Sequence, residues 1–512
     1  MFRFVYSPSF SVILFSLLLL TGAPAWGEAN WTAYVGNQTK TAPWAGFLRG
    51  VALGRSGTAL RSAEAGAAVD NAKLSELASH LAQYARDGDV IAPVGGLGSG
   101  RQQQRVNQFL DFISGDNAAA WKQIVEQQTR AVANATKNGQ GKVYWQIGNE
   151  INSRHFSATF RTWAGAEVPG QSRKQERPAR RMENGARAQS GRDSAKEERP
   201  PSRRRGDDKD DNGDTRTRAE GGARNDDFVI PIYVEYFLAP TVEGIRKASR
   251  ELRAPVPIVL GTLANSRAES SRDWLKRLLE YRIEGRFAST LKGRQVYELV
   301  DILAIHYLVS YPGDDWRATL DELHAEWVGR GGIRGIWSTE ELGRRRALRG
   351  IGAATSFKIV ARYLDWALDR QATPEQVRVN LWGGNLGQRN TQADYGLSML
   401  EQFLGQTALT PINHEAFGVS DNNIELYGFN SADTGKTVII VFGRERNTKA
   451  TLGQLSLGGV PPRKGDVQVH IFSKHGRSTA GRPVRSENGG RLQFKTPLNL
   501  DDETTVVIEL SG

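Results

Sequence analysis

The sequence predicts an α/β fold: a (β/α)8 TIM barrel with a disordered charged insertion and a C-terminal β-sandwich domain. Three observations predict it. Apolar strands and helical segments alternate from residue 141 to about residue 385, two of the strands end in glutamates, and short β-rich segments follow residue 418. Strands that are apolar throughout and are each followed by a helix are typical of a parallel sheet covered on its outer face. A chain of 512 residues, 39% of them hydrophobic, is large enough for a barrel and a smaller second domain.

Strand-like segments are clearest in the second half of the predicted barrel. Five of them occur from residue 143 onward, so three more strands must come from the region before it. Residues 88–96 are one candidate, and residues 47–53 and 32–36 are weaker candidates for the first two strands. The five segments are residues 143–150, 255–266, 300–313, 333–341 and 377–385. Helices are expected at residues 74–87, 103–137, 316–327 and 353–369.

The C-terminal region changes character. Its segments alternate between apolar and polar residues and are separated by turn sequences such as DTGK and ENGG, which predicts a β-sandwich over residues 418–512. The barrel is then expected at residues 28–410, with a linker at residues 405–419 leading into the sandwich. The strand-like segments are residues 424–430, 437–443, 466–472, 491–495 and 504–510.

The first 27 residues have the pattern of a secretory signal peptide. Arg3 precedes an apolar core from Val12 to Leu20, and the small residues Ala23 and Ala25 follow. The apolar core is too short for a membrane span, although an uncleaved N-terminal anchor is the alternative interpretation. We expect cleavage near residue 27, a secreted or periplasmic protein, and no stable membrane span after cleavage.

The charged insertion, residues 165–227, contains almost no aliphatic residues and a dense mixture of charges. It cannot bury enough apolar surface to offset the entropy of ordering, so it is expected to be disordered. One interpretation is a solvated loop, since long surface insertions cost little closure entropy. The other is a tether for an anionic polymer such as an acidic polysaccharide, which the formal net charge of +11 also favours. No aromatic residues interleave with its arginines, so nucleic acid is not the expected partner.

Metal and cofactor chemistry is not expected. The chain contains no cysteine, which excludes thiolate metal sites and disulfides. Its seven histidines are scattered and show no HExxH pattern or close pair at metal-ligand spacing. We therefore predict no cofactor.

The candidate catalytic residues lie at the ends of two predicted strands. The segment GKVYWQIGNE ends in Asn149 and Glu150, and the segment IRGIWSTEE ends in Glu340 and Glu341, before Gly343. The carboxyl ends of barrel strands form the active-site face, and a pair of carboxylates is what hydrolysis of a glycosidic bond requires. These endings therefore predict a carboxylate-pair hydrolase.

The same segments resemble a known group of enzymes. WQIGNE paired with IWSTEE, the intervening LAIHYL, the later LWGG and a C-terminal β-sandwich resemble glycoside hydrolase clan A, especially the families related to family 39 and family 5. The resemblance covers the chain from about Val143 onward, apart from the insertion. It implies a retaining glycosidase that cleaves O-glycosidic bonds of a polysaccharide or oligosaccharide by a two-glutamate double displacement.

The resemblance also assigns roles to residues. It implies that Glu150 is the acid/base, with a pKa raised by its surroundings, and that Asn149 binds the sugar hydroxyl next to the reacting carbon. The nucleophile is Glu340 if the strand is aligned on the W-x-T-E motif, and Glu341 if it is aligned on the E-x-G motif. Glu340 is favoured. The doubled glutamate keeps both candidates open, because neighbouring strand residues point to opposite faces.

Further residues are candidates for substrate binding. His306 and Tyr307 end the LAIHYL strand, where related families place groups around the nucleophile, although His306 could equally be a core histidine. Trp382 could stack on a sugar ring, or pack in the core. Trp145 is expected to pack in the barrel. Other residues that could line the site are Asn152, Arg154 and His155.

Two other classes of function are considered. One is a non-catalytic carbohydrate-binding or polysaccharide-assembly protein on a glycosidase-like barrel. The other is an Arg-rich nucleic-acid-binding protein or surface adhesin, which depends on the insertion alone. Intact Glu150 and an intact acidic pair at positions 340 and 341 favour the hydrolase.

Overall fold

The computed structural model describes two domains and includes the chain around Glu150, His306 and Glu341. The signal segment, residues 47–53 and nearly all of the insertion lie outside the described residues. The described residues are 35–37, 71–86, 89–94, 118–139, 141–153, 157, 160, 226–263, 266–309, 315–330, 332–341, 352–381, 391–405 and most of 409–511.

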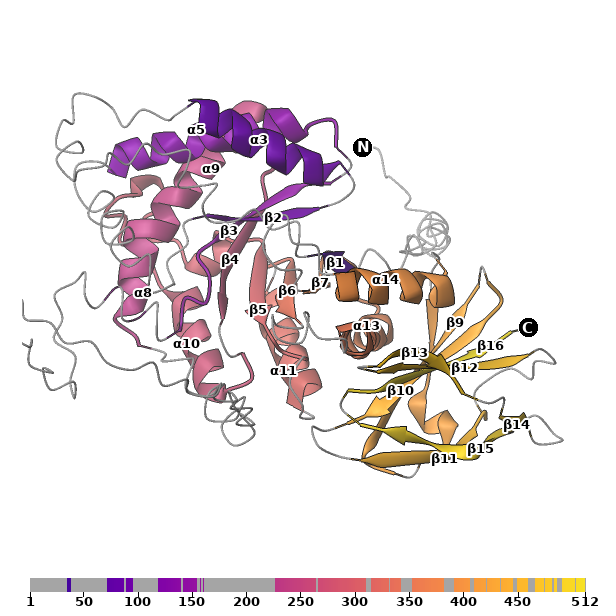
Figure 1. Cartoon of the computed structure of the whole chain (residues 1–512). Helices are drawn as coiled ribbons and strands as arrows, with labels where there is room; N and C mark the ends of the chain where they lie inside the picture. The colour runs from indigo at the N-terminus through magenta and orange to yellow at the C-terminus, as the bar shows by residue number, and fades with distance from the viewer. Residues whose placement is uncertain are drawn as a thin grey trace, which may run out of the picture.

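The N-terminal domain is built on a seven-stranded sheet whose strand pairs are all parallel (Figure 1). Its strands are β1 (Val35–Asn37), β2 (Val90–Val94), β3 (Val143–Ile147), β4 (Ile258–Leu263), β5 (Ile302–His306), β6 (Gly335–Glu341) and β7 (Val377–Leu381). Strands β2 to β7 neighbour one another in chain order, and β1 pairs with β7. A first strand that pairs with the last is what a sheet curling toward a barrel produces. The domain is therefore TIM-barrel-like, and an eighth strand between β1 and β2 stays a prediction.

Helices cover the outer face of this sheet. They are α3 (Asn71–Ala85), α5 (Ala118–Thr136), α8 (Val229–Ile232), the π-helix η4 (Tyr233–Leu238), α9 (Ala239–Leu252), α10 (Glu269–Glu280), α11 (Asp315–Leu323), the π-helix η7 (His324–Val328), α13 (Gly352–Asp369) and α14 (Thr391–Leu404). Short 3-10 turns occur at η5 (Ser289–Leu291) and η6 (Val296–Glu298). None of the described helices has the length and apolar character needed to cross a membrane.

Strand side chains alternate between two cores. Trp145 and Ile147 pack with the helices in the large core, so Trp145 lies in the barrel wall as predicted. Tyr144, Ala304 and Trp337 belong to a separate small cluster on the opposite face, and the rings of Tyr144 and Trp337 lie 4.6 Å apart. A sheet buried on both faces explains why its strands are apolar throughout.

The C-terminal domain contains a six-stranded and a three-stranded antiparallel sheet around a common core. The strands are β8 (Leu409–Ile412), β9 (Ile424–Ser431), β10 (Thr437–Gly443), β11 (Ala450–Ser456), β12 (Val467–Ser473), β13 (Gly476–Thr479), β14 (Val484–Arg485), β15 (Arg491–Leu500) and β16 (Thr505–Leu510), with a 3-10 turn η8 (His414–Phe417). All five strand-like segments of the sequence are strands. The segment predicted as a linker contains β8, which pairs with β9 and so belongs to the sandwich sheet.

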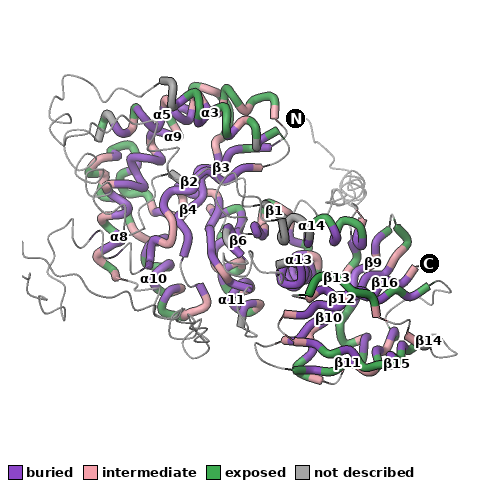
Figure 2. The backbone as a smooth tube through the Cα atoms, in the orientation of Figure 1, coloured by how far each residue is buried: buried purple, intermediate pink, exposed green. Residues whose placement is uncertain are grey.

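Helix α13 joins the two domains. It is buried along almost its whole length, because the barrel lies on one side of it and the six-stranded sheet on the other (Figure 2). The rings of Phe357 on α13 and Phe472 on β12 lie 4.5 Å apart, and the Thr505 hydroxyl donates to the carbonyl of Ala354 over 2.9 Å. The sandwich is thus packed onto the helix that follows the second glutamate-bearing strand.

Candidate active site

Glu150 lies in a sharp turn directly after β3. Gly148 and Glu150 both have positive φ, 85° and 47°. A non-glycine residue in this region costs about 1–3 kcal/mol and persists only where its surroundings fix it. The turn is fixed by two backbone hydrogen bonds, from Ser153 N to the Glu150 carbonyl at 2.8 Å and from Ile151 N to the Thr262 carbonyl on β4 at 2.9 Å. The sequence GNE therefore gives a strained, anchored turn that presents Glu150.

Tyr233 supports this turn from the helix layer. Its buried hydroxyl donates to the carbonyl of Ile147 over 2.6 Å, across 86 residues of sequence. Burial raises the pKa of Tyr233, so the hydroxyl stays a donor. Gly148 leaves room for the ring, since a Cβ there would lie 3.3 Å from it. Gly261 leaves room for the hydrogen bond itself, since a Cβ there would lie 2.5 Å from the Ile147 carbonyl oxygen and 3.2 Å from the Tyr233 hydroxyl. Tyr233 was not found from the sequence; its only signal is the aromatic run YVEYFL, which forms a π-helix of the kind frequent at functional sites.

Asn149 is held by its side-chain oxygen. Oδ1 accepts hydrogen bonds from Gln146 Nε2 at 3.2 Å and from Thr262 Oγ1 at 3.3 Å. Gln146 also donates to the carbonyl of Gly148 at 3.2 Å. Two donors on one oxygen fix the amide orientation, so that Nδ2 is the group that remains to donate.

His306 brings the ends of β3 and β5 together. Its Nδ1 lies 3.3 Å from Oε1 of Glu150, although β4 separates the two strands in the sheet. The His306 side chain is 1% exposed and that of Glu150 is 35% exposed. The carboxyl group of Glu150 is therefore contacted by a buried imidazole and still reaches solvent.

Tyr307, the residue after His306, also has an unusual backbone. Its φ is 53°, and its ring meets the ring of His306 edge-on at 5.5 Å. Of the four non-glycine residues with positive φ among those described, two are Glu150 and Tyr307. Strain of this kind clusters where a structure holds side chains for binding or catalysis.

The strand β6, which contains the two adjacent glutamates, has a bulge where it pairs with β5. Ile305 pairs with Ser338, but the next residue, His306, pairs with Glu340, so β6 has one extra residue at this point. The backbone of Glu340 thereby lies beside that of His306. A bulge is invisible to a prediction based on strict alternation, which is why the sequence left the two glutamates undecided.

Glu341 is completely buried. Its Oε1 accepts from Ser338 Oγ at 2.7 Å and from the backbone N–H of Val309 at 3.3 Å. Burial, followed by the negative charge of Glu341, raises the pKa of Tyr363 on α13, which places this carboxylate toward the helix layer. Glu341 thus ties the end of β6 to the segment after β5.

The remaining candidates are placed as follows. Asn152 is buried and its Nδ2 lies 3.4 Å from Ser271 Oγ on α10, so it joins the turn to a helix. Trp382, Arg154 and His155 lie outside the described residues, and their roles stay predictions. Within the described part of the chain, no group of three or more His, Asp or Glu side chains is arranged to hold a metal ion.

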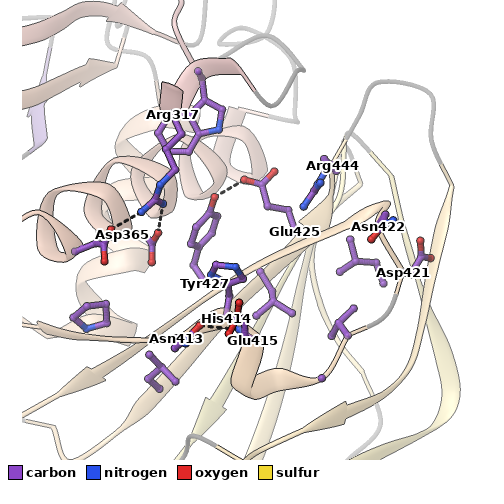
Figure 3. Close-up of a pocket in the computed structure, with 18 residues that line it drawn as sticks. Arg317, Asp365, Asn413, His414, Glu415, Asp421, Asn422, Glu425, Tyr427 and Arg444 are labelled. Atoms are coloured by element: carbon purple, nitrogen blue, oxygen red, sulfur yellow. Dashed lines mark hydrogen bonds and ion pairs between the residues drawn. The ribbon is translucent and has the colours of Figure 1, made fainter. Parts of the chain in front are cut away.

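A separate cavity of about 960 Å³ lies between the two domains (Figure 3). It is lined by α11, α13 and the β8–β9 region, and none of the candidate catalytic residues borders it. Arg317 forms ion pairs there with Asp365 at 2.8 Å and Asp369 at 2.7 Å, and Tyr427 donates to Glu425. This cavity is distinct from the site around Glu150.

Comparison with known proteins gives glycoside hydrolases as structural neighbours. A xyloglucanase of glycoside hydrolase family 44 from Paenibacillus polymyxa, solved with xyloglucan, is 11% identical, covers 95% of this chain and 97% of its own, and gives a TM-score of 0.41. AbfB, a family 51 α-L-arabinofuranosidase from Bifidobacterium longum, is 11% identical over 96% of this chain and 86% of its own, with a TM-score of 0.37. CelM2, a bifunctional glucanase-xylanase from a metagenome library, is 10% identical over 87% and 69%, with a TM-score of 0.37.

None of these three proteins is named as a member of family 39 or family 5, the families that the sequence resembles most. No family model and no curated protein sequence matches the chain. Because the TM-scores lie below 0.5, only the geometry of the site bears on the function.

Proposed function

We propose that the chain is a retaining glycoside hydrolase that cleaves O-glycosidic bonds of a polysaccharide through Glu150 and Glu340. The observation that carries this proposal is the position of His306. Its ring contacts the Glu150 carboxyl group, and its Cα is paired in register with Glu340. The carboxyl group of Glu150 and the backbone of Glu340 thus both lie beside His306 at the carboxyl ends of the strands, where barrel enzymes have their active sites.

Glu150 is the proposed acid/base. A general acid must reach the leaving oxygen and must hold a proton until the bond breaks. Partial exposure of its side chain supports the first requirement, and the contact with the buried His306 ring supports a fixed orientation. The strained turn at Gly148 and Glu150, held by Tyr233, supports a position that does not drift during the reaction.

Glu340 is the proposed nucleophile, which attacks the anomeric carbon to form a glycosyl-enzyme that water then hydrolyses. Retaining enzymes hold their two carboxyl groups about 5–5.5 Å apart. Glu150 follows β3 and Glu340 belongs to β6, with β4 and β5 between them, so this separation requires a strongly curved sheet, which the pairing of β1 with β7 supports. Glu341, in contrast, is completely buried, and this burial supports Glu340 as the glutamate that meets the sugar.

Asn149 is the proposed ligand of the sugar hydroxyl beside the reacting carbon. Its Oδ1 is occupied by Gln146 and Thr262, which leaves Nδ2 to donate to that hydroxyl. Tyr307 and Trp382 are proposed to contact the sugar as well. A secreted or periplasmic location is proposed from the N-terminal signal pattern alone.

The experiment is a substrate panel. The purified chain is incubated with a neutral β-glucan, xylan, arabinan and the uronate polymer alginate, and released reducing ends are measured for the wild type and for Glu150→Gln. The proposal predicts release from at least one polymer and a loss of about 10²–10⁴-fold in the variant. Binding without release in the wild type would instead favour the carbohydrate-binding protein, and equal rates for both proteins would exclude Glu150 as the acid/base.

A further inference from the structure

A buried ion pair connects the sandwich to the barrel. Arg362 on α13 and Glu425 on β9 form a two-pronged contact, with Nε 2.8 Å from Oε1 and Nη2 2.6 Å from Oε2. Their side chains are only 6% and 11% exposed. Tyr427 donates a further hydrogen bond to the same carboxylate, as drawn in Figure 3. Paired donors on a carboxylate fix the plane as well as the position of the guanidinium.

The same guanidinium reaches the segment after β5. Nη1 of Arg362 donates to the carbonyl of Val309 over 2.8 Å, and this bond is buried. Val309 lies three residues after His306 and two residues after Tyr307 along the chain. Arg362 therefore binds a sandwich carboxylate and the active-site segment at once.

Val309 also contacts β6, the strand that ends in Glu340 and Glu341. Its backbone N–H donates to Glu341, and Glu341 accepts from Ser338 on the same strand. One peptide segment is thus held between Arg362 on its carbonyl side and Glu341 on its N–H side. His306 lies three residues before Val309, and Glu340 directly precedes Glu341. These are the residues proposed to meet beside Glu150.

We propose that Glu425 of the sandwich is a positioning residue for the barrel active site. It holds Arg362 in the orientation that fixes Val309, and through Val309 it sets the placement of His306 and Glu340 relative to Glu150. This inference rests on the proposed function. It makes the sandwich a part of the catalytic scaffold and not an independent sugar-binding module.

A purely structural ion pair would behave differently. Removing one partner of any buried pair destabilises a protein, because a charge is left buried without compensation. Positioning requires in addition that turnover fall while substrate binding changes little, since small displacements of reacting groups can cost about 100-fold in rate. A matched control is Glu509, a buried carboxylate of the same domain that pairs with Lys436 at 2.8 Å.

The experiment compares Glu425→Gln, Glu425→Asp and Glu509→Gln in the full chain. Hydrogen exchange of peptides that cover residues 302–309 reports on the Val309 amide, and kcat and KM are measured on the best-cleaved polymer of the panel. The proposal predicts faster exchange and a fall of about 10–100-fold in kcat for Glu425→Gln, with KM within about threefold. Glu425→Asp is expected to recover part of both effects, and Glu509→Gln to show neither.

Unchanged exchange in Glu425→Gln, or equal losses of kcat in Glu425→Gln and Glu509→Gln, would overturn the proposal. If Glu425→Gln does not fold, Glu425→Asp and Tyr427→Phe give smaller perturbations of the same pair. Wild-type exchange of the Val309 amide in both of these variants would also overturn the proposal. If the wild type cleaves no polymer, the proposed function fails, while the exchange comparison still tests the link from the sandwich to Val309.

Discussion

Replacing Tyr233 by phenylalanine tests how Glu150 is held. The substitution removes one hydroxyl and keeps the buried ring, so the packing in η4 and the space left by Gly148 and Gly261 are unchanged. The lost interaction is the 2.6 Å hydrogen bond to the carbonyl of Ile147. A hydrogen bond contributes about 0.5–1.5 kcal/mol net, and a buried acceptor that loses its donor costs about 1–3 kcal/mol. We expect the free energy of unfolding to fall by about 1–2 kcal/mol.

Activity should fall as well. Ile147 is the last residue of β3, and the turn that carries Glu150 begins at the next residue. Loosening this anchor by an amount that raises the reaction barrier by about 1.4 kcal/mol would lower kcat about tenfold. The control is Tyr236→Phe in the same π-helix, because the Tyr236 hydroxyl accepts a hydrogen bond from Arg286 at the surface.

Urea unfolding measures the stability change, and reducing-end release from the cleaved polymer measures kcat. Tyr233→Phe should be impaired in both assays, and Tyr236→Phe should match the wild type within about 0.5 kcal/mol and twofold. Wild-type stability and turnover in Tyr233→Phe would refute the idea that this hydroxyl anchors the catalytic turn.

Three further predictions concern β6, β4 and the domain interface. Glu340→Gln should lose about 10³-fold or more in kcat with little change in stability, whereas Glu341→Gln should be destabilised because the donors to this buried carboxylate lose a charged acceptor. Urea unfolding and kinetics of both variants check this. The reverse pattern would make Glu341 the nucleophile. Gly261→Ala should lower the free energy of unfolding by about 1–3 kcal/mol, as measured in urea, because its Cβ would lie 2.5 Å from the Ile147 carbonyl oxygen. An unchanged urea midpoint would show that β4 can shift to accommodate the methyl group. Burial alone would raise the pKa of Glu425, but the adjacent Arg362 guanidinium holds this pKa below its usual range, so the carboxylate should stabilise the fold fully above about pH 5 and lose this contribution as the pH falls through the lowered pKa. The difference in unfolding free energy between wild type and Glu425→Gln, measured in urea from about pH 3 to 7, should therefore become smaller at acid pH. A difference that stays constant with pH would contradict the assignment.

Much of the fold follows from patterns along the chain. The strands from β3 to β7 are apolar throughout because both faces of the sheet are buried, and the sandwich strands alternate because one face meets a core. The site was also partly predictable, since Glu150 follows β3, His306 ends β5, and parallel strand ends gather at one edge. Their contact at 3.3 Å follows from that geometry.

Other features depend on packing that no local pattern encodes. The bulge in β6 shifts the backbone register between Ser338 and Glu340, and alternation gives no sign of one extra residue. Tyr233 acts across 86 residues, and Arg362 meets a carboxylate from another domain. Such contacts depend on how helices and sheets dock, which the sequence specifies only through the whole core.

The configuration of the first product tests the central claim most directly. Proton NMR during early hydrolysis of the cleaved polymer distinguishes the two anomers before they interconvert. Glu150 and Glu340 acting as acid/base and nucleophile at about 5–5.5 Å predict a product that retains the configuration of the cleaved bond. An inverted product would require two carboxyl groups about 6.5–9.5 Å apart and would contradict the double displacement through these two residues.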